Sequence, residues 1–279
     1  MKNLLTRTVS GIVFIGVMAG CLLGGDIPYA CLMLFLMAGM LFEFYELTLG
    51  KGKWLQKIIG MLFGAVLWAA GFFLLQNRTR ADAADFAALT VLCFFVLWLI
   101  LPVIQLFRKE EKPFLVIAYV LSGVLYIAVP LSLLNFPGAV AGRPALLGLF
   151  AILWSNDVGA YVFGMLFGQK GKHKLFPSIS PKKSWEGFAG GVFTALAAGY
   201  ALSSLGVLPY GLFHTLALSL LIAVFGVLGD LVESMLKRSA GVKDSGKIIP
   251  GHGGLLDRFD AALLALPAAC FYIIMITLF

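Results

Sequence analysis

Acidic and basic residues gather in the segment 229–260, between two strongly apolar stretches. Asp230 and Asp257 supply carboxylate oxygens, which Mg²⁺ accepts as ligands together with water and substrate phosphate oxygens. Four cations of the segment could neutralise phosphate: Lys237, Arg238, Lys243 and Arg258. This combination predicts a site for a metal ion and a phosphorylated substrate. The alternative, a salt-bridged surface loop, leaves the His-Gly-Gly run at 252–254 unexplained.

One helical face would bring part of this segment together. Asp230, Glu233, Ser234 and Lys237 follow one another at i, i+3, i+4 and i+7. That spacing places side chains on the same side of an α-helix. The four side chains share a face in this way if the helix of the preceding apolar stretch continues beyond the membrane surface.

A second basic loop covers residues 169–186, where lysines stand beside glycines and serines. Backbone N–H and hydroxyl groups of such loops approach phosphate oxygens closely while ammonium groups neutralise charge. The candidate substrate-binding residues are Lys172, Ser180, Lys182, Lys183 and Glu186. An anchor for anionic lipid headgroups is the simpler explanation of the charge alone, and no G-x-x-x-x-G-K-[ST] phosphate loop is present. We expect the next helix to begin near Ser184, with Glu186 in its first turn.

A polar pair, Asn156-Asp157, interrupts a long apolar stretch well inside its ends. An ionised carboxylate facing lipid is costly, so such residues usually face a polar cavity. The pair is therefore predicted to contact substrate or another ligand. The structural alternative is that Asp157 caps a broken helix or pairs with a buried lysine.

The elements that must position these residues are membrane helices. Hydrophobic residues make up 61% of the 279-residue chain and charged residues 13%, which excludes a soluble globular protein. The pattern predicts an all-α, polytopic integral membrane protein with about nine spans. These are 8–24, 28–48, 58–76, 86–107, 114–136, 144–168, 187–206, 210–229 and 261–278.

The positions of the basic residues predict the orientation of the chain. When successive loops are assigned to alternate sides, 18 of the 21 Lys and Arg residues share the side of the amino terminus. The other side holds Arg78, Arg80 and Arg143. The positive-inside rule then places the amino terminus and both basic loops in the cytoplasm.

The composition changes near residue 140 and suggests two parts. We predict a transmembrane scaffold over 1–140 and a catalytic transmembrane half over 141–279, with cytoplasmic loops 169–186 and 230–260. Glu43 and Glu46, near one end of the second apolar stretch, are acidic exceptions in the first part. Their role stays open between the membrane interface and a polar cavity. The four cysteines are scattered and support neither a disulfide framework nor a zinc site.

From Ser234 to Asp260 the chain follows one long pattern: Ser, any, apolar, Lys-Arg, four residues, Lys-Asp, any, small, two residues, apolar, Pro, any, His-Gly-Gly, apolar, any, Asp-Arg, apolar, Asp. This resembles the signature of the phosphatidate cytidylyltransferase, or CDP-diacylglycerol synthase, family. The segment 180–187 and Asn156-Asp157 are similar to that family as well. Candidate site residues inside the signature are Ser234, Lys237, Arg238, Lys243, Asp244, His252, Gly253, Gly254, Asp257 and Arg258.

The resemblance implies a homodimeric enzyme of the cell inner (plasma) membrane, with a polar funnel that opens to the cytoplasm. Its substrates would be CTP and phosphatidic acid, and its products CDP-diacylglycerol and pyrophosphate. Asp230 and Asp257 would be the aspartates of a metal centre for Mg²⁺, with a second metal ion left open. A phosphomonoester is largely ionised at neutral pH, so His252 is expected to orient the loop or contact phosphate rather than act as a base.

Three other functions agree less well with these residues. A polyprenol kinase would share CTP and a cytoplasmic phosphate loop, but the complete signature disfavours it. A transporter or channel for an anionic solute would explain buried polar residues without requiring carboxylates fixed beside lysines. A CDP-alcohol phosphotransferase is disfavoured because the chain lacks an Asp-Gly-x-x-Ala-Arg pattern.

Overall fold

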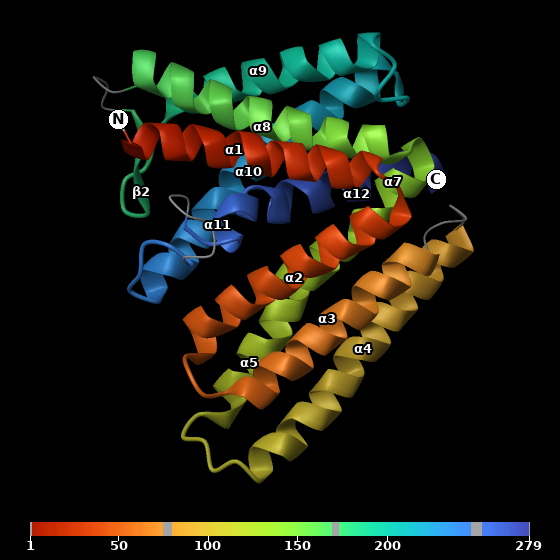
Figure 1. Cartoon of the computed structure of the whole chain (residues 1–279), viewed down its shortest axis with the longest axis vertical. Helices are drawn as coiled ribbons and strands as arrows, with labels where there is room; N and C mark the ends of the chain where they lie inside the picture. Colours follow the sequence, from red (N-terminus) through yellow and green to blue (C-terminus); the bar gives the residue numbers. More distant parts are fainter. Residues whose placement is uncertain (1, 75–79, 169–172, 247–252, 279) are drawn as a thin grey trace. The chain divides into compact units, whose positions relative to one another are not determined.

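The computed structural model describes residues 2–74, 80–168, 173–246 and 253–278, which are predominantly helical (Figure 1). The chain forms two compact units. The first comprises Met1–Val140 and Asp244–Arg258, and the second comprises Ala141–Lys243 and Phe259–Phe279. Much of the predicted loop 230–260 therefore packs with the amino-terminal part of the chain.

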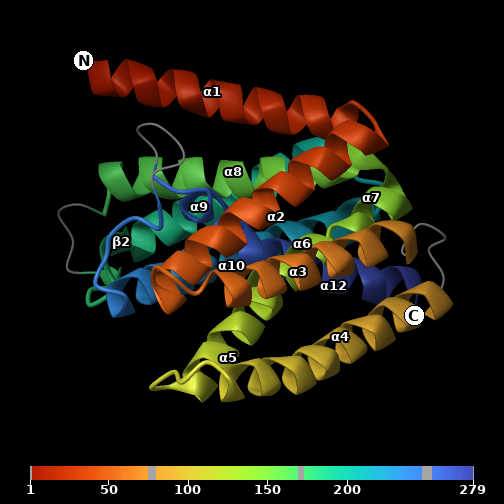
Figure 2. The same ribbon diagram turned by 60° about the horizontal axis from the view of Figure 1, so that its bottom comes forward.

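The first unit is a bundle of helices. Its elements are α1 (Lys2–Leu23), α2 (Asp26–Leu49), α3 (Trp54–Leu74), α4 (Arg80–Leu106), α5 (Pro113–Gly123), the π-helical turn η1 (Val124–Ala128), α6 (Val129–Leu133) and α7 (Asn135–Ala141). Within this unit α3 lies between α2 and α4, as Figures 1 and 2 both show.

Tyr45 holds α2 against its neighbours in this bundle. Its ring is fully buried, and its hydroxyl donates a hydrogen bond to the Val120 carbonyl at 3.0 Å. A Cβ atom at Gly60 of α3 or at Gly123 of α5 would overlap the ring. The two glycines let the backbones of α3 and α5 close on Tyr45, which fixes how α2 is rotated about its axis.

The second unit contains the remaining long helices. Its elements are α8 (Arg143–Leu166), β1 (Lys174–Phe176), β2 (Ser180–Ser184), α9 (Trp185–Ser204), α10 (Gly211–Ser239) and α12 (Ala262–Leu278), while α11 (Leu256–Phe259) lies where the two units join along the chain. Helices α8 and α9 run side by side (Figures 1 and 2). A Cβ atom at Gly187 of α9 would lie 2.8 Å from the Ala160 carbonyl oxygen of α8, so a glycine is needed at this close approach.

Six helical segments in the described part of the chain are long and apolar enough to cross a membrane. They are Asp26–Leu49, Trp54–Leu74, Ala84–Leu106, Pro113–Gly138, Arg143–Leu166 and Gly211–Ser239. The apolar helices Ser10–Leu23 and Ala262–Leu278 are shorter. The chain is thus a multi-pass membrane protein, and the count of nine spans stays a prediction.

The chain is mostly helical, as expected, and one small sheet lies within the predicted loop 169–186. Strands β1 and β2 pair antiparallel in a small hairpin, with Lys174 opposite Ser184 and Phe176 opposite Ser180. Pro181 lacks a backbone N–H, yet it fits because a strand in a two-stranded sheet has an unpaired edge. The expected helix start is confirmed: α9 begins at Trp185, and the hydroxyl of Ser184 accepts the Gly187 N–H at 3.2 Å.

Candidate active site

Asp257 ties together the two described limbs of the signature loop, residues 244–246 and 253–258. Its carboxylate is 9% exposed, and Oδ2 accepts the backbone N–H groups of Ser245 at 2.9 Å and of Gly254 at 2.8 Å. Gly253 has a positive φ of 84°, a conformation that favours glycine. The two limbs of the signature loop are therefore held together by hydrogen bonds to one carboxylate.

A second carboxylate, that of Glu43 in α2, holds the same loop. Glu43 is 3% exposed, and its oxygens accept hydrogen bonds from Ser245 Oγ at 3.0 Å, Leu255 N at 3.0 Å and Leu256 N at 2.8 Å. A Cβ atom at Gly246 or Gly254 would overlap this carboxylate. The close approach of the Glu43 carboxylate explains why position 254 of the signature is a glycine. The predicted contact of Gly254 with substrate stays a prediction.

In the second unit Asp230 is oriented from two sides. Its Oδ2 lies 2.7 Å from the ammonium of Lys183, and its Oδ1 accepts the hydroxyl of Ser234 at 3.2 Å. Lys183 also donates to the Val227 carbonyl, at 3.4 Å. Helix α10 continues to Ser239, so one helical face does carry Asp230 and Ser234. The pairing with Lys183 joins the second basic loop to that face.

Farther along the same face of α10, Glu233 and Lys237 form an ion pair one turn apart. Glu233 is fully buried and Lys237 nearly so. The Lys237 ammonium, predicted to contact phosphate, therefore already neutralises a buried carboxylate. Separating the two side chains would leave a buried charge without a partner, which is costly, so Lys237 is held strongly against Glu233.

Asp260 is a site neighbour that the sequence-based list of residues omitted. Burial raises its pKa well above the ordinary value, and the negative charges of Asp230, Glu233 and Asp157 raise it further. Its backbone lies against α10, since a Cβ atom at Gly229 would be 2.6 Å from the Asp260 carbonyl oxygen. Its place as the final residue of the signature was the signal that could have identified it.

The hairpin orients Glu186 at the start of α9. His173 Nδ1 lies 3.0 Å from Glu186 Oε1, and the Trp185 N–H donates to the His173 carbonyl at 3.1 Å. The pKa of Glu186 is lowered, first by its hydrogen bond to its own backbone N–H and then by His173. Lys182 and Ser180 lie in β2, where the Lys182 side chain is exposed.

The two members of the polar pair in α8 have different surroundings. Asn156 is fully buried, and a Cβ atom at Gly191 would lie 2.6 Å from its Oδ1. Among the described residues its amide atoms have no hydrogen-bond partner. Asp157 is exposed, and its charge acts on Asp260.

Comparison with known proteins decides the family. Residues 5–276 match the Cytidylyltransferase family. The chain belongs to the cytidylyltransferase family. A phosphatidate cytidylyltransferase of Bacillus subtilis (strain 168) is 35% identical over 272 residues, which is 95% of this chain and 94% of that protein. Proteins of the same name from Staphylococcus aureus (strain COL) and Staphylococcus saprophyticus are 42% and 41% identical over 159 residues, 57% of this chain and 60% of theirs. The protein is therefore a nucleotidyltransferase.

Several predicted residues of this cytidylyltransferase remain to be placed. Lys172 and His252 lie outside the described residues. The side chains of Arg238, Lys243, Asp244 and Arg258 are exposed within their own units. Arg238 donates to the Val242 carbonyl at 3.0 Å. In the described ranges no three His, Cys, Asp or Glu residues are gathered as a metal cluster.

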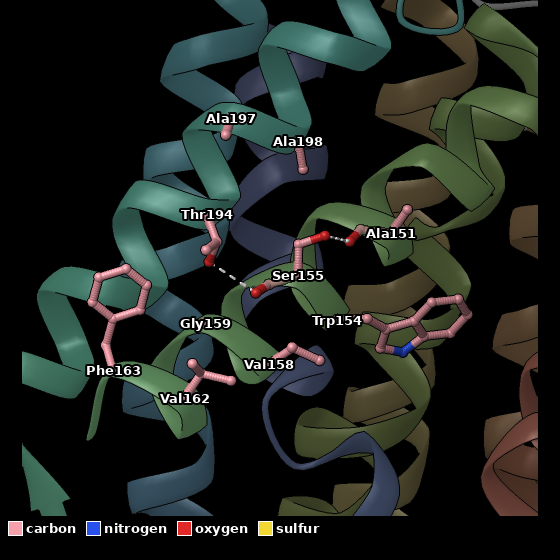
Figure 3. A pocket seen from close by; sticks show the side chains of 10 residues that line it. All are labelled: Ala151, Trp154, Ser155, Val158, Gly159, Val162, Phe163, Thr194, Ala197 and Ala198. Carbon is pink, nitrogen blue, oxygen red and sulfur yellow. Dashed lines mark hydrogen bonds between the residues drawn. The ribbon is translucent and has the colours of Figure 1, made fainter. Parts of the chain in front are cut away.

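A cavity of about 660 Å³ lies between α8 and α9 of the cytidylyltransferase (Figure 3). Both hydroxyls in its wall are turned onto backbone: Ser155 donates to the Ala151 carbonyl at 2.8 Å, and Thr194 to the Ser155 carbonyl at 2.9 Å. The remaining described lining is apolar and includes Trp154, Val158 and Phe163. This cavity suits an apolar occupant and contains none of the predicted site residues.

Proposed function

We propose that this enzyme is a phosphatidate cytidylyltransferase, which converts CTP and phosphatidic acid to CDP-diacylglycerol and pyrophosphate in phospholipid biosynthesis. The observation that carries the proposal is the 35% identity to the Bacillus subtilis phosphatidate cytidylyltransferase over nearly the full length of both chains. The unbroken signature from Ser234 to Asp260 lies within the matched residues. The closed loop around Asp257 and the oriented Asp230 carboxylate are consistent with it.

The orientation of the enzyme follows from its charge. We propose nine spans, with the amino terminus and the loops 169–186 and 230–260 on the cytoplasmic side of the cell inner membrane, where CTP is available. The support is the unequal distribution of Lys and Arg between the two sides. We propose a homodimer as well, on the family resemblance alone.

In the proposed reaction a phosphate oxygen of phosphatidic acid attacks the α-phosphorus of CTP, and pyrophosphate leaves. The attacking group is an anion at neutral pH, since the second pKa of a phosphomonoester is about 6. The protein therefore need not remove a proton, and His252 is proposed to orient the loop or contact phosphate. Its main tasks are to align two anionic substrates and offset their charge.

Exposed basic side chains are available to neutralise the negative charge of the two substrates. Lys182 of the hairpin, Arg238 at the end of α10, Lys243 and Arg258 are exposed and can reach phosphate oxygens from their own units. Lys237 and Lys183 already face carboxylates, so we assign them to hold Glu233 and Asp230 in position beside the substrate. Ser234, Asp244 and Gly253 complete the proposed site.

Asp230 and Asp257 would hold Mg²⁺, and the residues fit such an ion. Mg²⁺ binds through one or two carboxylates and keeps water and substrate phosphates as its other ligands. Burial, and after it the negative charges of Asp230 and Glu233, raises the pKa of Asp260, which is consistent with several acidic side chains near Asp230. Bound Mg²⁺ would supply Lewis-acid stabilisation of the CTP phosphates.

Isotope placement tests the assigned reaction. The purified enzyme is incubated with phosphatidic acid, Mg²⁺ and CTP labelled at either the α- or the γ-phosphate. Attack at the α-phosphorus carries the α-label into the lipid fraction and the γ-label into pyrophosphate. Lipid label that arises from γ-labelled CTP alone, with release of CDP, would identify a lipid kinase and reject the proposal.

A further inference from the structure

We infer that Glu43 of α2 is a positioning residue for nucleotidyl transfer, which acts through the loop that carries Asp257. The inference rests on the proposed function for its catalytic consequence, and on the contacts of the first unit for its structural part. Glu43 lies more than 200 positions before the loop in the chain. It belongs to the part of the sequence that was predicted to be scaffold.

The hydrogen bonds of Glu43 fall directly beside Asp257. The two backbone N–H groups that it accepts belong to Leu255 and Leu256, which immediately precede Asp257. Its third partner, Ser245, donates its own backbone N–H to Asp257. Two carboxylates, one from α2 and one from the loop, thus share Ser245 and hold both limbs of the loop.

The face of α2 that carries Glu43 is shaped to receive the loop. Gly39 lies one turn before Glu43, and a Cβ atom there would overlap the Leu255 side chain, which is buried. Tyr45, two residues after Glu43, points to the opposite side of the helix, into α3 and α5. Packing of the bundle therefore depends on one face of α2, and support of the loop depends on the other.

A carboxylate is the appropriate side chain for this task. Its two oxygens accept several hydrogen bonds, whereas a glutamine in its place would present an NH₂ group to N–H donors. Hydrogen bonds to a charged acceptor are stronger than those between neutral groups. The hydroxyl of Ser245 and the backbone N–H groups of Leu255 and Leu256 compensate for the burial of this carboxylate.

Glu46 provides a matched control. It lies on the same helix one turn later and pairs with the buried Lys57 of α3, away from the loop. Glu43→Gln and Glu46→Gln each replace a carboxylate by its amide isostere. A general weakening of the bundle should appear in both variants, whereas a loss of loop support should appear in Glu43→Gln alone.

The test compares full-length wild type, Glu43→Gln, Glu46→Gln, Ser245→Ala and the double variant Glu43→Gln/Ser245→Ala. Hydrogen–deuterium exchange of residues 253–258, measured without substrates, reports the loop. Initial rates with CTP and phosphatidic acid give kcat and KM. We expect exchange in Glu43→Gln to be at least about tenfold faster and kcat to fall at least about tenfold, with the KM for CTP little changed.

Ser245→Ala keeps the test informative if Glu43→Gln does not fold. Ser245→Ala removes one of the three hydrogen bonds to Glu43, so its exchange rate and kcat should change in the same direction as in Glu43→Gln, but less. Because both substitutions act on the same contact, the double variant should differ little from Glu43→Gln alone. Wild-type exchange in Glu43→Gln, faster exchange with unchanged kcat, or an equal loss in Glu46→Gln would each overturn the inference. Wild-type enzyme without cytidylyl transfer would instead reject the proposed function, and the exchange data would still report on the loop.

Discussion

The ammonium of Lys183 lies 2.7 Å from the carboxylate of Asp230, and this contact joins the hairpin of the second unit to the carboxyl-terminal third of α10. Both side chains are partly exposed, so the pair contributes little to stability. The ion pair fixes the position of the Asp230 carboxylate, and the positive charge of Lys183 lowers the repulsion between Asp230 and the neighbouring acidic side chains. The pKa of Asp260 is raised first by burial and then by the negative charge of Asp230.

We expect Lys183→Ala to lower kcat by one or more orders of magnitude and to shift the free energy of unfolding by less than about 1 kcal/mol. Lys53→Ala is the matched control, since it removes a similarly exposed pair with Glu110 at 3.1 Å. Activity and thermal unfolding of the purified variants check this. A loss of activity that merely follows the loss of stability would argue against a role for Lys183 at the site.

Asp230→Asn and Asp257→Asn should each abolish most activity while the protein remains folded and in the membrane. Each change removes one anionic ligand for Mg²⁺ but keeps the size of the side chain. In Asp257→Asn the remaining oxygen can still accept the N–H groups of Ser245 and Gly254, so the loop should persist. Pyrophosphate release is measured over a range of Mg²⁺ concentrations, and near-normal turnover at limiting Mg²⁺ would show that the carboxylate is not a ligand.

The Glu186 carboxyl should titrate below its ordinary pKa of 4.5. Because the folded-state value is lowered, the stabilisation it gives to the hairpin is present above 4.5 and is lost as the pH falls through the lowered value. Carboxyl-labelled NMR titration of wild type and His173→Gln checks this. The pKa should rise in His173→Gln but stay below the ordinary value, since the backbone hydrogen bond remains; an ordinary value in wild type would contradict the prediction.

The proposed orientation places Lys243 in the cytoplasm and Arg143 on the other side of the membrane. In a background without the four native cysteines, Lys243→Cys should resist an impermeant thiol reagent in intact cells and react after the membrane is opened. Arg143→Cys should react in intact cells. The reverse pattern would reject the nine-span arrangement.

Local features of the site followed from the sequence because local rules govern them. Ser184 begins α9, since a hydroxyl at that position satisfies a free N–H of the first turn. Helix α10 carries Asp230 and Ser234 on one face, since residues four apart meet on a helix. The sequence did not predict the two short strands at 174–184, which pair with each other inside the predicted loop 169–186.

The sequence by itself determined the membrane character, the approximate helices, the family signature and the two aspartates on which the proposed chemistry depends. These properties are set by composition, by helical spacing and by a pattern of neighbouring residues. Only the tertiary structure decided that Glu43 supports the Asp257 loop and that Asp260 lies among the acids around Asp230. The hydrogen bonds of Glu43 join positions more than 200 residues apart. The packing of α2 brings them together, and no spacing along the chain reports that packing.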